Sequence, residues 1–431
     1  MKIAQKQPLS KSLICAGLLL TGAIVSTQAA ATVPEDPDTF LTFLERYVPE
    51  DAVSATAYYD AVDPDGKKTT YKDWLVETGF IEASDFATSG QMDLNDDVTS
   101  VLHKNETDLG FVRAVSMRCV PNCNHRNPDI YSLIENYANF EDAAARENRL
   151  ASVTMEWTAA ADGTRPNKKF VVFYAFTGTT ATTPEDFRDT RDQSPDTPFA
   201  PDLDGRGNKE VPGVCNSCHG GTPLKLKKNG DYRRKGNTGS LFLALDLDNF
   251  GFGSEVDTNV LSRAAQQAAY KQQNQAVLIT HRGPEEFDEE AEIWRVPAGQ
   301  EVIEGWYGGP GMPGDTFDGE FVPPGWLPPA APEEAEKLYL SSVVPACRAC
   351  HAQQERALDF ATYEGFMVFE DAHKDLVLRV ECGLDDDSNT RTGGGDDQAV
   401  MPLAKLTYEI FWSGSQVKVF KDHIGDVDCG N

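Results

Sequence analysis

Apolar and polar residues alternate along two neighbouring segments of this chain. In 152–158 (SVTMEWT), Val153, Met155 and Trp157 stand at every second position, which is typical of one face of a strand. A turn-rich stretch follows, and 168–176 (KKFVVFYAF) then has the composition of a second strand. Two such runs joined by a turn predict an antiparallel hairpin.

Elsewhere the spacing of apolar residues is helical. The predicted helices are 36–47, 70–80, 260–279 and 358–373, together with 332–344 and 402–412, which begin with proline. Residues 305–332 are too rich in Gly and Pro for regular structure, and their aromatic residues predict a packed, ordered loop. The chain is therefore expected to be α+β.

The organisation along the chain follows from these elements. We expect a mixed N-terminal domain over 32–200 that contains the hairpin and ends in the polar, proline-bearing stretch 179–202. Two mainly helical regions with long ordered loops follow, over 201–330 and 331–431.

The first 31 residues have the pattern of an export signal. Lysines at 2, 6 and 11 precede the apolar run 13–25, and Ala29 to Ala31 fit a cleavage site, so the mature chain would begin near Thr32. The apolar run is shorter than a membrane span requires. We expect a periplasmic protein with no membrane span after signal cleavage.

The chain is strongly acidic. Its net charge is −29, and the predicted signal removes three lysines and no acids, which gives −29 − 3 = −32. Such a surface repels phosphate backbones and excludes nucleic acid as an expected partner. It suits a basic protein partner or a salty medium.

Two Cys-x-x-Cys-His motifs carry the clearest chemistry. They comprise Cys215, Cys218 and His219, and Cys347, Cys350 and His351. On a helix these positions share one face, so two thiols can form thioethers with the haem vinyl groups while the imidazole binds iron. Two covalently bound haem c groups are predicted, with Gly220 and Gly221 leaving room beside the first macrocycle.

Two other uses of such motifs fit less well. A redox-active dithiol has no need of the histidine and belongs in a βαβ setting, which this chain lacks. Structural zinc needs four ligands at short spacing, whereas the two histidines are 351 − 219 = 132 residues apart. A zinc-stapled binding protein is therefore the remote alternative.

The second axial ligand decides what a haem can do, because an open position allows chemistry on small molecules. For the second haem we expect Met401, which lies 50 residues after His351 and precedes a proline-started helix. Met367 and His373 compete but are expected to pack in a helix.

The first haem has no methionine or histidine between 220 and 280. Its candidates are His281 and Met312 downstream and Met117, His125 and Met155 upstream, and otherwise its site is open. Met155 is expected in the core.

Four cysteines remain outside the motifs and the signal. In an oxidising compartment three pairings are possible, and the favoured one joins Cys119 to Cys123 and Cys382 to Cys429. Three acidic stretches are reminiscent of calcium loops, but none completes that pattern. No catalytic side chain is predicted.

Several phrases together resemble a group of exported bacterial proteins described only as containing cytochrome c domains. They are LDGRGNKEVPGVCNSCHGG, LFLALDLDNF, GWYGG, EFVPPGW, LYLSSVVPACRACH and VMPLAKLTYEIFW, within about 203–413. The resemblance implies haem binding and electron transfer, and it does not identify a substrate. A weaker resemblance, to dihaem cytochrome c peroxidases, implies one haem open to peroxide, but there the first motif lies near the mature N-terminus.

The sequence thus predicts a periplasmic dihaem c-type cytochrome that carries electrons between redox partners. The loop 305–327 would shield or bridge the haems. The alternative is a dihaem redox enzyme, peroxidase-like or an oxidase, that uses an open first haem.

Overall fold

The structure is a computed structural model in which these residues are described: 52–82, 94–177, 188–189, 210–256, 259–283, 286–288, 293–351, 360–368 and 405–425. The predicted export signal and the predicted helix 36–47 lie outside them. The fold is mixed α+β, as expected. Within the described residues no helix is both long and apolar enough to cross a membrane.

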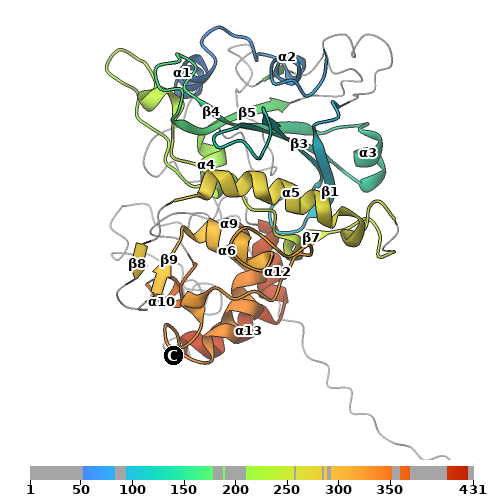
Figure 1. Ribbon diagram of the computed structural model, residues 1–431, viewed down its shortest axis with the longest axis vertical. Helices are drawn as coiled ribbons and strands as arrows, with labels where there is room; N and C mark the ends of the chain where they lie inside the picture. The colour runs from blue at the N-terminus through green and yellow to red at the C-terminus, as the bar shows by residue number, and fades with distance from the viewer. Residues whose placement is uncertain are drawn as a thin grey trace, which may run out of the picture.

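One antiparallel sheet dominates the N-terminal half (Figure 1). Its strand order is β6-β5-β4-β3-β2-β1-β7, with bounds β1 Thr99–Asn105, β2 Val112–Val120, β3 Asp129–Tyr137, β4 Ala151–Ala159, β5 Lys169–Thr177, β6 Arg188–Asp189 and β7 Phe250–Gly251. Strands β4 and β5 pair over their full length. This confirms the predicted hairpin.

Sequence reasoning missed β1, β2 and β3 because polar side chains are buried on them. His103 on β1, Ser116 on β2, and Ser132 and Glu135 on β3 are buried in the sheet. Burial of polar groups is exceptional and requires partners, and here Tyr71 and Arg149 bond the Glu135 carboxylate. Such positions hide the alternation that marks a strand.

Helices cover both faces of the sheet (Figure 1). On one face lie α1 (Ala52–Val62) and α2 (Tyr71–Glu77), and the Trp74 indole of α2 donates to Glu156 on β4. On the other face lie α4 (Gly213–His219) and α5 (Arg263–His281). The Gln273 amide of α5 donates to the carbonyls of Thr99 and Val115.

Two of the predicted helices in this half are present. α2 falls within 70–80, and α5 matches 260–279, capped by the Ser262 hydroxyl, which accepts from the Ala265 N–H. The short elements of this half are α3 (Phe140–Ala145), η5 (Arg233–Gly236) and η6 (Leu247–Asn249), and β8 (Glu286–Asp288) pairs with β9 (Ile293–Arg295).

The C-terminal part is helical. Its elements are α6 (Ala298–Trp306), η7 (Pro324–Trp326), α7 (Ala335–Leu338), η8 (Tyr339–Val343), α8 (Val344–Ala346), α9 (Arg348–His351), α10 (Tyr363–Met367), α12 (Lys405–Ser413) and α13 (Gln416–Ile424). The predicted helix 332–344 is thus a run of short helical pieces. Trp306, Tyr307 and Trp326 are fully buried, so the glycine- and proline-rich segment is packed, as predicted.

Buried apolar residues form two main clusters. The first runs from Tyr58 to Phe317 and includes both sheet and α5 residues, and the second runs from Val322 to Ile424. The first Cys-x-x-Cys-His motif lies beside the first cluster, and the second motif beside the second. The expected boundary near 200 lies outside the described residues, and the first core contains residues from both sides of it.

Candidate haem-attachment site

The first motif is an α-helical turn held by its own interior residue. Asn216 is buried, and its amide nitrogen donates to Gly220 O at 2.9 Å, Thr238 Oγ1 at 3.1 Å and Ser240 Oγ at 2.6 Å. Because Asn216 points into the protein, the half-buried Cys215 and Cys218 lie on a different part of the helix surface.

The His219 imidazole has a defined tautomer. Its Nδ1 lies 2.9 Å from the carbonyl oxygen of Leu241. A carbonyl only accepts, so Nδ1 carries the proton and Nε2 keeps its lone pair. Burial is the main cause that lowers the pKa of His219 to about 4, which keeps the ring neutral. A neutral imidazole whose second nitrogen is fixed by a carbonyl is the form that binds metals.

The second motif is anchored by the residue after its first cysteine. Arg348 is 2% exposed, and its guanidinium binds the Asp246 carboxylate through two hydrogen bonds of 2.7 and 2.9 Å. The guanidinium also lies over the Trp306 ring, 5.1 Å from its centroid. This bidentate pair fixes α9 against η6.

The two motif helices, α4 and α9, lie against each other. The side chains of Cys218 and Cys350 interact, and this interaction lowers the pKa of Cys218 and raises that of Cys350. Motifs separated by more than a hundred residues of sequence therefore meet at their second cysteines. None of the four motif cysteines is in a disulfide.

A short segment, Leu241–Asp246, joins the two motifs, and we call it the joint segment. Its first carbonyl accepts from His219, and its last side chain binds Arg348. Between them, the backbone of Leu245 exchanges two hydrogen bonds with the Asn274 side chain of α5, at 2.8 and 3.0 Å. Sequence reasoning missed the roles of Arg348 and Asp246. Their only signal was a charged residue inside a motif and an acidic residue in an apolar run.

His351 is placed by an aromatic neighbour. Its ring stacks on Phe360 with centroids 4.2 Å apart and planes 4° from parallel. His219 has an aromatic neighbour too, since Phe173 of β5 lies 5.2 Å from it. The first motif therefore faces the sheet.

The predicted distal ligands are placed as follows. Met401 lies outside the described residues, four positions before α12 begins. Helix α12 contacts both α8 and the turn between β1 and β2, where the Thr407 hydroxyl donates to Thr107 O. Met117 is buried on β2, and Met312 is buried in a turn.

Strand register relates two methionines to the first motif. Phe173, which contacts His219, pairs across the sheet with Met155 on β4. Met155 pairs with Ser132 on β3, and Ser132 pairs with Met117 on β2. Adjacent strands are about 4.8 Å apart. Met155 is thus one strand from Phe173 and Met117 is three, and both are buried, which agrees with the expected core position of Met155.

His281 has a structural setting. Its Nε2 donates to Phe242 O at 2.7 Å, and its Nδ1 faces Gly299, where a Cβ atom would lie 2.3 Å away. Leu241 and Phe242 offer consecutive carbonyls to His219 and His281. The nitrogen that would bind iron is already occupied by the joint segment.

Gly221 lies where two backbone segments approach each other closely. A Cβ there would lie 2.6 Å from Thr238 O and 2.8 Å from Ser240 N, and φ is +78°, so this position requires glycine. The predicted disulfide Cys119–Cys123 is present, whereas Cys382 and Cys429 lie outside the described residues.

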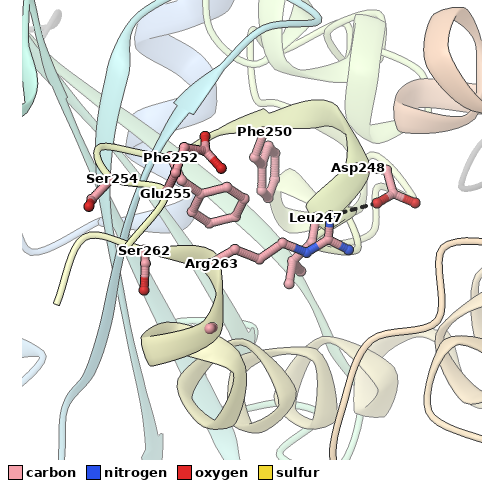
Figure 2. A pocket seen from close by; sticks show the side chains of 9 residues that line it. Leu247, Asp248, Phe250, Phe252, Ser254, Glu255, Ser262 and Arg263 are labelled. Atoms are coloured by element: carbon pink, nitrogen blue, oxygen red, sulfur yellow. Dashed lines mark hydrogen bonds and ion pairs between the residues drawn. The ribbon is translucent and has the colours of Figure 1, made fainter. Parts of the chain in front are cut away.

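Two surface cavities lie near the joint segment. One, of about 240 Å³, is lined by Phe250, Phe252 and Arg263 among others, and Arg263 forms an ion pair of 2.8 Å with Asp248 (Figure 2). The other, of about 600 Å³, is lined by Asp248, Gly319, Glu320, Glu336, Leu340 and Val344. Three of the residues that line this larger cavity are acidic, and another, Val344, lies three positions before Cys347 in the sequence.

The described residues contain no group of three or more His, Cys, Asp or Glu side chains arranged to hold a bare metal ion. No known protein family, curated protein or solved structure matches the chain.

Proposed function

We propose that this chain is a periplasmic c-type cytochrome that carries electrons between redox partners through two covalently attached haems. His219 and His351 would be the proximal ligands, and Met401 the distal ligand of the second iron. The observation that carries the proposal is the His219 tautomer. Its Nδ1–H donates to Leu241 O and leaves Nε2 for iron, beside two cysteines of the same helix.

The residues present fit a haem in three respects. Cys215 and Cys218 are three positions apart on one helix, and Cys347 and Cys350 are three positions apart at the second motif, which matches two vinyl groups on one ring. The imidazole beside the first pair is neutral. Two buried indole N–H groups, on Trp306 and Trp412, have no acceptor among the described residues.

These unpaired donors lie near the second motif. Trp306 contacts Arg348, and Trp412 is on α12, which packs against α8 just before Cys347. A buried donor left unpaired costs about 1–3 kcal/mol. A haem propionate would be an acceptor of the right charge for such a donor.

When bound, haem supplies a reversible one-electron couple at iron. The residues of this chain would hold it in place. The cysteines fix the ring, Leu241 fixes the rotation of the His219 imidazole, and the Arg348–Asp246 pair fixes the second motif. None of these roles requires a catalytic acid or base.

The test is to export the full-length chain in a bacterium that matures c-type cytochromes. We expect a mass above that of the polypeptide by two haems and a low-spin absorption spectrum. Replacing His219 with alanine should keep both haems attached while one becomes high-spin, because only its axial ligand is lost. Lys225→Ala, at an exposed residue outside the motifs, is the control. A colourless protein would refute the proposal.

Addition of carbon monoxide to the reduced protein separates the two functions. Two haems that do not bind it support electron transfer. Rapid binding by one haem would instead support the redox enzyme with an open first site.

A further inference from the structure

Beyond haem attachment itself, we infer that the two haems form one electronically coupled pair, brought together where the Cys218 and Cys350 helices meet. The inference rests on the proposed function. It goes further because two attachment motifs could equally serve two independent haems, as two separate domains would provide.

The contact between the two motif helices carries this inference. Helices α4 and α9 lie against each other, and the side chains of Cys218 and Cys350, the second cysteines of their motifs, interact there. In a thioether each sulfur bonds to a substituent carbon of a porphyrin edge, and the S–H is gone. Haems attached at both motifs would therefore lie close together.

The structure fixes this approach from both sides. Asn216 ties α4 to the Thr238 and Ser240 hydroxyls, and Arg348 ties α9 to Asp246. Both anchors belong to one continuous stretch that ends in the joint segment, which is itself bonded to α5. The two motifs are thus held by the same short stretch of chain rather than by independent domains.

Proximity has an electrostatic consequence. Removing an electron from one haem makes removal from the other harder, because the two charges repel across a partly buried site. The two midpoint potentials should therefore separate through mutual interaction. The pair would accept or give two electrons in sequence at one place, which suits partners that exchange electron pairs.

Circular dichroism in the Soret region tests the inference. Close porphyrins couple their transitions and give a two-signed band that neither haem gives alone. The comparison uses the wild-type protein and two single-haem variants, Cys215→Ser with Cys218→Ser, and Cys347→Ser with Cys350→Ser. We expect a two-signed band in the wild type that exceeds the sum of the two variants. A wild-type spectrum equal to that sum would overturn the inference.

A second measurement uses the wild type alone, in case a single-haem variant does not fold. Electron paramagnetic resonance of the fully oxidised protein should show broadened haem signals, and half-reduction should sharpen those that remain. Signals that are unchanged by half-reduction, apart from intensity, would mean that the haems are independent. Haem content distinguishes the two failures, because a protein with two haems and no coupling refutes only the pairing.

Discussion

At the scale of single residues, two histidines that both bond to the joint segment have different roles. His219 donates through Nδ1 to Leu241 O and keeps Nε2, whereas His281 donates through Nε2 to Phe242 O. The choice of nitrogen is set by which carbonyl of the joint segment faces each ring. A sequence shows two histidines and does not show this difference, because it arises only when α4 and α5 pack on either side of residues 241–242.

The buried His281 predicts a loss of stability in acid. Burial lowers its pKa from 6.5 to about 4, so between these values the unfolded chain binds a proton that the folded chain does not. The contribution of neutral His281 to the free energy of unfolding is present above pH 6.5 and is lost as the pH falls toward 4. A shift of this size corresponds to about 3 kcal/mol. The measurement is the free energy of unfolding by urea across this pH range.

His281→Gln keeps a donor for Phe242 O and removes the titration. In this variant the loss between pH 6.5 and 4 should be smaller than in the wild type by about 3 kcal/mol. Equal losses in both proteins would show that His281 is accessible to protons in the folded state.

At the scale of elements, the Arg348–Asp246 pair joins α9 to η6. Both side chains are almost fully buried, at 1% and 3% exposure. Removing one partner of such a pair leaves a buried charge without compensation and costs about 3–5 kcal/mol. We therefore expect Arg348→Met to lower the free energy of unfolding by this amount, and the added change Asp246→Asn to recover much of it.

The matched control is the exposed pair Lys418–Asp422, with side chains 76% and 60% exposed. Lys418→Met should change stability little, because exposed ion pairs contribute little. Chemical denaturation measures all three variants. If Arg348→Met and Lys418→Met had similar effects, the buried pair would not hold the second motif in place.

The elements also show what the sequence could and could not reveal. The β4–β5 hairpin and α5 were predictable, because their apolar spacing is clean and their turn and cap residues agree with it. Strands β1 to β3 were not, since Ser116, Ser132 and Glu135 are buried where apolar residues are expected. The two motifs could be found from local spacing, and the contact between Cys218 and Cys350 could not, because it depends on tertiary packing.

At the scale of the whole molecule, a group of acidic side chains lies close to the second motif. The net charge is −29. Asp248, Glu320 and Glu336 line a cavity of about 600 Å³ that reaches Val344, three residues before Cys347. A basic partner would be drawn to this side, because opposite charges raise the rate of encounter. If the proposed function holds, electrons would leave from the second haem here.

Salt should therefore slow electron transfer to a basic partner. Between ionic strengths of about 0.01 M and 1 M the Debye length falls from about 30 Å to about 3 Å. We expect the bimolecular rate with a small basic cytochrome, measured by stopped flow, to fall about tenfold or more. Glu320→Gln with Glu336→Gln should flatten this dependence, and a small acidic cytochrome should show the opposite slope. A rate with the basic partner that does not change with salt would show that the acidic surface does not guide association.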